Sequence, residues 1–129
     1  MNKPILCLDF DGVIHSYESG WQGADVIPDP PVQGAIDFLR EAVKHFRVCI
    51  FSSRSHQEGG GTAMRTWLGH HIMIAEPGII MQAPPWFTLI EWPLNKPSAF
   101  VTLDDRALCF TGQWPSIDYL KSFKPWNKR

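Results

Sequence analysis

The segment LCLDFDGVIHS, residues 6–16, contains two aspartates, Asp9 and Asp11, directly after an apolar run. In an extended backbone the side chains of residues i and i+2 leave the same face, so these two carboxylates would lie close together and repel each other. A cation between them, or a shared proton, would remove the repulsion. Gly12 follows at once and suits a tight turn of the backbone. The sequence therefore predicts a bound cation or a shared proton at this turn.

Four later residues carry groups that suit the same chemistry: the Ser52 hydroxyl, the Lys96 ammonium group and the carboxylates of Asp104 and Asp105. With the first pair they would place four carboxylates in one pocket, which needs a counterion. Oxygen ligands without nearby sulfur or paired histidines favour Mg²⁺, whose coordination is completed by water and substrate phosphate. The set predicts a phosphoryl site in which the cation, Lys96 and Ser52 hold the non-bridging oxygens. One carboxylate would attack phosphorus and another would transfer the proton.

These groups would be positioned by three short apolar runs, residues 5–8, 48–51 and 99–103, each of which stops at a polar position. The runs are continuous rather than alternating, which is typical of parallel strands covered by helices on both faces. In open α/β sheets, ligands bind outside the carboxyl ends of the strands, so the polar residues should converge on one crevice. The sequence therefore predicts an α/β fold with a parallel sheet.

A helix is predicted between the first two runs. Apolar residues between Val32 and Phe46 recur at helical spacing, and charged residues take the other face. The prolines at 30 and 31 suit the start of this helix, where a missing N–H is harmless. Strand, helix and strand together make a βαβ unit.

The second half of the chain has weaker signals. A glycine cluster after residue 55 predicts a flexible turn followed by a helix over 62–68, and a short strand is expected over 88–92. Beyond residue 105 we expect a short strand, a turn at 111–112, a brief helix over 116–123 and a basic tail.

The composition indicates an ordinary globular protein. A length of 129 residues fits one domain, residues 1–129, and the net charge of -1 provides no general attraction for nucleic acid or anionic membranes. Cys7, Cys49 and Cys109 form no CxxC pair and are expected to be reduced, inert core residues, which favours a cytoplasmic protein. The sequence shows neither a secretory leader nor an apolar stretch of about 20 residues. No obligate protein partner is evident.

Four short motifs follow one another along the chain: DFDGV, then FSSRS after an apolar strand, then NKP, then VTLDDRA. Together they resemble the four motifs of the haloacid dehalogenase-like (HAD) superfamily and cover the chain from residue 5 to about residue 110. One DxD is a weak signal, whereas four ordered motifs on the expected strand ends are a specific one. The resemblance implies a Rossmann-like, three-layer domain with a mostly parallel central sheet. It also implies an Mg²⁺-dependent phosphomonoester hydrolase that forms an aspartyl-phosphate.

The same resemblance implies a role for each catalytic residue. Asp9 would be the nucleophile, and Asp11 would protonate the leaving group and then activate water. Ser52 would bind the transferring phosphoryl group, while Lys96 would pair with Asp9 and the phosphate. An aspartate at position 11 favours a phosphatase, because the dehalogenases of the superfamily typically lack it and the P-type ATPases carry threonine there.

The resemblance also implies the metal ligands. Asp9, Asp104 and Asp105 would hold Mg²⁺, together with Asp11 through its backbone carbonyl. Which of Asp104 and Asp105 touches the metal directly stays open at this point.

Substrate choice in this superfamily usually comes from cap insertions, and this chain looks capless. Only a short flap, residues 14–31, separates the first motif from the predicted helix, and no globular insert is evident between residues 52 and 96. The chain resembles small capless members often encoded by bacteriophages and prophages, in which SGW, DDRA and FTG recur. Such open sites suit phosphates on nucleic-acid ends, phosphoproteins or exposed sugars, and small nucleotides also stay open as substrates.

Residues near the expected site allow more than one interpretation. Trp21 in the flap could stack a base or sugar, or it could pack the flap onto the domain. His15 and Tyr17 are close enough in sequence to line the entrance. Arg54 could clamp a substrate phosphate, or it could pair with a carboxylate of the protein.

Three other functions stay open beside the phosphatase. A signalling receiver domain also uses aspartate, Mg²⁺, a hydroxyl group and lysine, but it phosphorylates an aspartate on a later strand, and the order of motifs here argues against it. A nucleic-acid-end binding or repair module would act on a 3′ or 5′ phosphate, with weak and salt-sensitive affinity at this net charge. A metal-binding scaffold without turnover would keep the same motifs.

Overall fold

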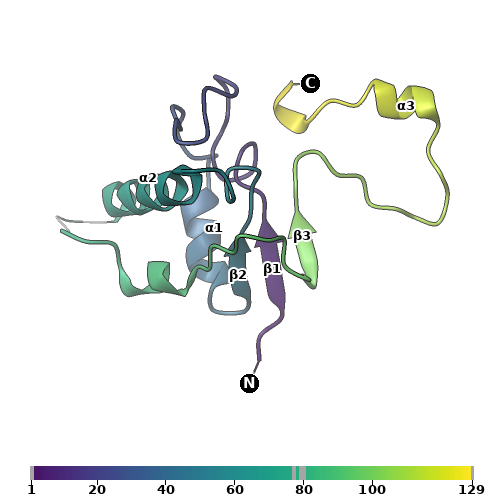
Figure 1. The fold of residues 1–129 in the computed structure, drawn as a ribbon. Coiled ribbons are helices and arrows are strands. Elements are labelled where there is room, and N and C mark those ends of the chain that lie inside the picture. Colours follow the sequence, from purple (N-terminus) through teal and green to yellow (C-terminus); the bar gives the residue numbers. More distant parts are fainter. Residues whose placement is uncertain (1, 77, 79–80, 129) are drawn as a thin grey trace.

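The computed structural model describes residues 2–76, 78 and 81–128. A three-stranded sheet lies at its centre, with β1 (Ile5–Leu8) between β2 (Arg47–Ile50) and β3 (Val101–Leu103) (Figure 1). Both neighbours run parallel to β1. The predicted α/β fold with a parallel sheet is confirmed, and the strand ends lie within two residues of the predicted ones.

Helix α1 (Ala35–Ala42) forms within the predicted segment but begins later than expected. A helix start at the prolines 30–31 is wrong because this stretch pairs with the chain that follows β1. The Val32 N–H donates to the Ile14 carbonyl at 2.8 Å. The helix begins only after Gly34, whose φ of 86° is in the left-handed region that glycine tolerates.

Helix α2 (Gly60–Ala75) is much longer than the predicted 62–68. The expected flexible glycine turn is wrong, since Gly60 and Gly61 form the first turn of this helix. A side chain at Gly60 would collide with the backbone carbonyl of Arg54. The glycine is therefore required by the close approach of two backbones rather than by flexibility.

The segment after α2 contains a 3₁₀ helix, η1 (Pro85–Leu89), where a strand over 88–92 was expected. Within residues 88–92, only Glu91 pairs with β2. The Ile50 N–H donates to the Glu91 carbonyl at 2.9 Å, and the Glu91 N–H donates to the Val48 carbonyl at 2.8 Å. Pro93 prevents a longer ladder because it lacks the N–H that the next bond, to the Ile50 carbonyl, would need. The chain then runs across the sheet to β3 (Figure 1).

The hydrophobic core joins one face of the sheet to the two longer helices. Leu6 is opposite Val48, and Leu8 is opposite Ile50, so these four side chains leave the sheet on the same side. All four are buried in one cluster with apolar residues from or beside α1 and α2: Leu39, Ala42, Val43, Met64, Leu68 and Ile72. The core therefore fixes the ends of β1 and β2, where the candidate site residues begin.

The cysteines do not all lie in the core. Cys7 and Cys49 are free and buried within β1 and β2, as predicted. Cys109 is free but exposed, so the expectation of a buried residue is wrong at this position. It follows β3, on a part of the chain that leaves the body of the protein.

The chain after β3 projects from the body and then returns to it (Figure 1). The predicted brief helix is present as α3 (Ile117–Lys121), and the chain bends at Gly112, whereas the described residues after β3 form no further strand. A 3₁₀ turn, η2 (Trp126–Lys128), returns to the body, where Trp126 Nε1 donates to the Gly12 carbonyl at 2.8 Å. Among the described residues, none of the helices has the length and apolar character needed to cross a bilayer.

Candidate metal centre

Three carboxylates meet at the carboxyl edge of the sheet. Asp9 directly follows β1, and Asp104 and Asp105 directly follow β3, which is the neighbouring strand. The Asp9 N–H donates to the Leu103 carbonyl at 3.0 Å, which continues the strand pairing to this point. One carboxylate oxygen of each residue lies within 4.8 Å of the others. The three aspartates are thus close enough to share one metal ion, as the sequence predicts.

The raised pKa of Asp9 shows that the cluster lacks a compensating positive charge. Burial, a hydrogen bond with Asp105 and the negative charges of Asp104 and Asp105 together raise the pKa of Asp9 to about 8, and burial contributes most. The Phe10 N–H donates to Asp9 Oδ1 at 2.8 Å and lowers the pKa, but by less. Without a cation, the cluster therefore holds a proton at neutral pH. A divalent cation would take the place of that proton, and oxygen ligands of this type suit Mg²⁺ or a similar hard ion.

A cavity of about 150 Å³ opens beside the cluster. Its lining brings together Asp9, Asp104, Ser52 and Lys96, four of the residues that the sequence singled out, from three separate parts of the chain. Lys96 is exposed, and no carboxylate oxygen within the described residues lies within 4.0 Å of its ammonium group. Its positive charge can therefore face an anion in the cavity.

Ser52 is held by the turn that follows β2. The hydroxyl oxygen accepts a hydrogen bond from the Arg54 N–H at 3.1 Å, and the Ser52 N–H donates to Ser55 Oγ at 2.9 Å. The side chain is buried, so its orientation is set by these bonds. Because the oxygen accepts from the backbone, the hydroxyl hydrogen remains available for an oxygen atom in the cavity.

Asp11 lies apart from the three clustered carboxylates, and two donors hold its side chain. Arg54 Nε donates to Asp11 Oδ2 at 2.9 Å, and His15 Nδ1 lies 2.9 Å from Asp11 Oδ1. His15 Nε2 accepts from the Asp29 N–H at 3.1 Å, so the ring proton is on Nδ1 and points to Asp11. The described geometry thus places the Asp11 carboxylate between an arginine and a histidine, and any contact with the metal would come from its backbone carbonyl.

His15 is buried, not at the entrance where the sequence placed it. Its ring stacks on Phe10 with centroids 5.7 Å apart and meets the edge of Trp67 at 5.4 Å. One feature of the sequence points to the contact of this ring with Asp11: a histidine stands four residues after an aspartate in an otherwise apolar turn. Tyr17 stays beside this ring, at 5.8 Å, with a φ of 60°.

Arg54 is fully buried and joins the flap to the site. Besides Asp11, its Nη1 donates to the carbonyls of Gly23, Ala24 and Val26 at 2.8, 2.8 and 3.1 Å. Of the two roles that the sequence left open, the structure places this guanidinium on a carboxylate of the protein. A direct clamp on substrate phosphate does not fit a side chain without solvent exposure.

Trp21 covers this arginine from the flap. The Arg54 guanidinium carbon lies 4.7 Å from the centroid of the Trp21 ring, which is a cation–π contact. The ring is 47% exposed, so it packs the flap and still presents one side to solvent. Asp29 closes the base of the flap by accepting hydrogen bonds from the Ser19 N–H and hydroxyl at 2.7 and 2.6 Å.

Gly12 lets the turn after β1 lie directly against the carboxylate of Asp105. Its φ is 83°, and an added Cβ would collide with the Asp105 carboxylate. Replacing it by alanine should destabilise the protein by about 1–2 kcal/mol from backbone strain and should displace Asp105. We expect weaker binding of Mg²⁺ in Gly12→Ala, measured by isothermal titration calorimetry, whereas Gly20→Ala, at a positive φ with open space around it, should cost stability but leave the affinity unchanged.

Comparison with protein-family models, with curated proteins and with solved structures found no match. The function must therefore be argued from the arrangement of the residues. In that arrangement, the carboxylates of Asp9 and Asp104, a hydroxyl and an ammonium group surround one cavity, and the third carboxylate, Asp105, lies in the cluster beside it.

Proposed function

We propose that the protein is an Mg²⁺-dependent phosphomonoester hydrolase of the HAD-like superfamily, with a Rossmann-like, three-layer domain. The observation that carries the proposal is the meeting of Asp9, Asp104 and Asp105 beside a cavity that Ser52 and Lys96 also line. A site of this composition can neutralise and orient a phosphoryl group. The position of the cluster at the carboxyl edge of a parallel sheet supports the same assignment.

In the proposed reaction, Asp9 attacks the phosphorus atom and the bond to the leaving oxygen breaks, which forms an aspartyl-phosphate. Bound Mg²⁺ would supply charge neutralisation at the phosphoryl oxygens and keep Asp9 ionised. Lys96 and the Ser52 hydroxyl, which also line the cavity, hold the non-bridging oxygens. These residues also orient the phosphorus atom toward Asp9.

Asp11 moves the proton in both halves of this reaction. It gives a proton to the leaving oxygen and then removes one from the water that hydrolyses the aspartyl-phosphate. Arg54 and His15 fix its position, because Arg54 Nε donates to both carboxylate oxygens and His15 Nδ1 donates to Oδ1. Both are positioning residues, since neither is exposed to a substrate.

The open surroundings support a large or exposed phosphorylated substrate. The flap is short and is tied down by Arg54, and between β2 and β3 the described chain contains only α2, η1 and connecting segments. We therefore propose nucleotides, nucleic-acid ends or other exposed phosphomonoesters as the substrate class. The half-exposed Trp21 ring would be available to stack a base.

The direct test is phosphate release from a panel of nucleotides, sugar phosphates and end-phosphorylated oligonucleotides, with Mg²⁺ and with EDTA. We expect release that requires Mg²⁺ and falls by about 10³-fold or more in Asp9→Asn, which removes the nucleophile. Asp37→Asn, an exposed aspartate on α1, is the matched control and should keep full activity. Release that persists in Asp9→Asn or in EDTA would contradict the proposal, as would the absence of release from every substrate class.

A further inference from the structure

The chain exposes more surface than a compact monomer of its size. Its accessible surface is 8533 Å², whereas a folded monomer of 14.7 kDa is expected to expose about 6,900 Å². The excess of about 1,600 Å² is roughly twice the area that one partner buries in a standard interface. An excess of this size matches the surface that each copy loses in a tightly associated homodimer.

Part of the excess comes from residues 106–123, which we call the projecting loop. This loop leaves the body after β3 and carries α3 (Figure 1). Trp114 is 86% exposed, and its ring centroid lies 4.8 Å from that of Phe110. Four more apolar or aromatic side chains of the loop are exposed: Leu108, Ile117, Tyr119 and Leu120. A loop of this length and composition is unusual on an isolated domain unless it binds something.

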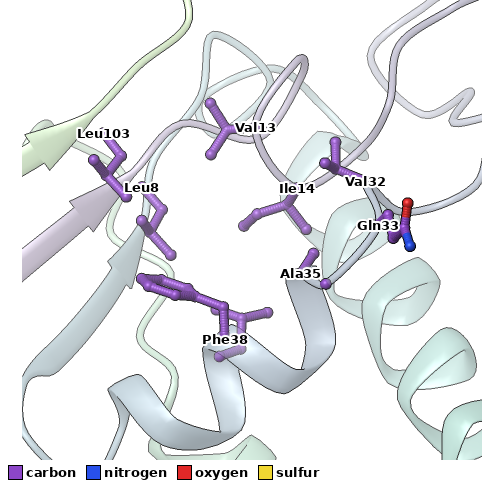
Figure 2. A pocket seen from close by; sticks show the side chains of 10 residues that line it. Leu8, Val13, Ile14, Val32, Gln33, Ala35, Phe38 and Leu103 are labelled. Atoms are coloured by element: carbon purple, nitrogen blue, oxygen red, sulfur yellow. The ribbon is translucent and has the colours of Figure 1, made fainter.

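A second apolar feature lies at the carboxyl ends of β1 and β3, where Phe38 and Leu103 are exposed at the rim of a groove and Leu8 is buried in it. This groove of about 230 Å³ runs between the β1 and β3 ends and α1, and its lining includes Leu8, Val13, Phe38 and Leu103 (Figure 2). Next to it, β3 is an edge strand whose three residues are all exposed. Strands of parallel sheets are normally covered, and open edges are normally protected.

We propose that two copies of the chain associate about a two-fold axis, with the Phe110–Trp114 pair of each copy packed in the groove of the other. The same chain carries both the uncovered groove and the exposed aromatic pair, which is what a self-complementary two-fold interface requires. Aromatic side chains that fill a pocket at the centre of an interface contribute most of the binding energy. The inference is independent of the proposed phosphatase activity.

The test is the mass of the full-length protein by light scattering after size exclusion, at about 100 μM and about 1 μM. We expect the dimer mass of about 29 kDa, twice that of the chain. Trp114→Ser, on the loop, and Phe38→Glu, in the groove, should each convert the protein to the 14.7 kDa monomer. Ile74→Glu, at an exposed position on α2 outside the groove, is the matched control and should remain a dimer.

Circular dichroism and thermal melting of each variant show whether it is folded, so that loss of the dimer is separated from loss of structure. A wild-type monomer at 100 μM overturns the inference. A dimer that survives either Trp114→Ser or Phe38→Glu also overturns it, because the groove would then not hold the aromatic pair.

Discussion

The Asp9→Asn variant is expected to melt at a higher temperature than the wild type when both are free of metal at pH 8, although it loses its proposed activity. Burial and the neighbouring carboxylates raise the pKa of Asp9, so its ionisation in the folded state is unfavourable. Asparagine keeps the acceptor for the Phe10 N–H but carries no charge. We expect an increase on the order of 5 °C.

The free energy of unfolding should depend on pH with a defined sign. The folded protein binds a proton at Asp9 up to about pH 8, whereas the unfolded chain releases it near the ordinary value of 3.8. Between these values the native state binds more protons, so the free energy of unfolding decreases as the pH rises from about 4 to about 8. Asp9→Asn lacks this group and should show a shallower decrease. Mg²⁺ should stabilise the wild type more at pH 8 than at pH 5, where protons compete for the ligands.

Melting curves of the wild type, Asp9→Asn and Asp37→Asn at pH 5 and pH 8, in EDTA and in Mg²⁺, measure these effects. Asp37 is exposed on α1, so Asp37→Asn should follow the wild type. A metal-free Asp9→Asn protein that is less stable than the wild type at pH 8 would show that the three carboxylates do not repel one another.

Replacing Arg54 by alanine is expected to cause the largest loss of stability, about 3–5 kcal/mol. The change leaves the Asp11 carboxylate with one donor fewer and removes the donor to three flap carbonyls. It also removes the partner of the Trp21 ring. Denaturation by urea measures the free energy of unfolding, with the slope compared between variants.

Arg40→Ala is the matched control for this variant. Arg40 also binds two acidic residues, Asp37 and Glu76, but it is partly exposed on α1, and its loss should cost less than about 1 kcal/mol. Equal losses for the two arginines would mean that Arg54 is not the residue that ties the flap to Asp11. Arg54→Lys should lie between the two, since an ammonium group cannot serve the carboxylate and all three carbonyls.

The sheet could be predicted from the sequence because buried parallel strands are continuous apolar runs, and residues 5–8 show this clearly. The residues at which the helices begin could not be predicted from the sequence. The prolines at 30–31 fit a helix start locally, but their backbone pairs with a segment that lies far away in the sequence. Gly60 fits a turn locally, yet it is the close approach of the Arg54 carbonyl that requires glycine there. Both errors arise from tertiary contacts that local patterns do not contain.

The candidate site also contains contacts that the sequence could predict and contacts that it could not. The meeting of Asp9 with Asp104 follows from strand ends on one sheet edge, so the sequence could predict it. For the His15 contact with Asp11 the sequence shows only a spacing of four residues, because the contact itself depends on the Asp29 N–H and on the packing of the ring against Phe10 and Trp67. The sequence showed which groups are present, whereas the flap determined which of them are buried.

The strand order has a consequence for the synthesis of the protein. β1 leaves the ribosome before β2 and α2, and its second neighbour, β3, follows only after both of them. Until then, one edge of β1 is unpaired, and Asp9 lacks the two carboxylates that complete the cluster. Until β3 has been made, the nascent chain therefore carries an unpaired edge of β1, a state that is prone to aggregation. Competence to bind metal should appear only after residue 105 has left the exit tunnel.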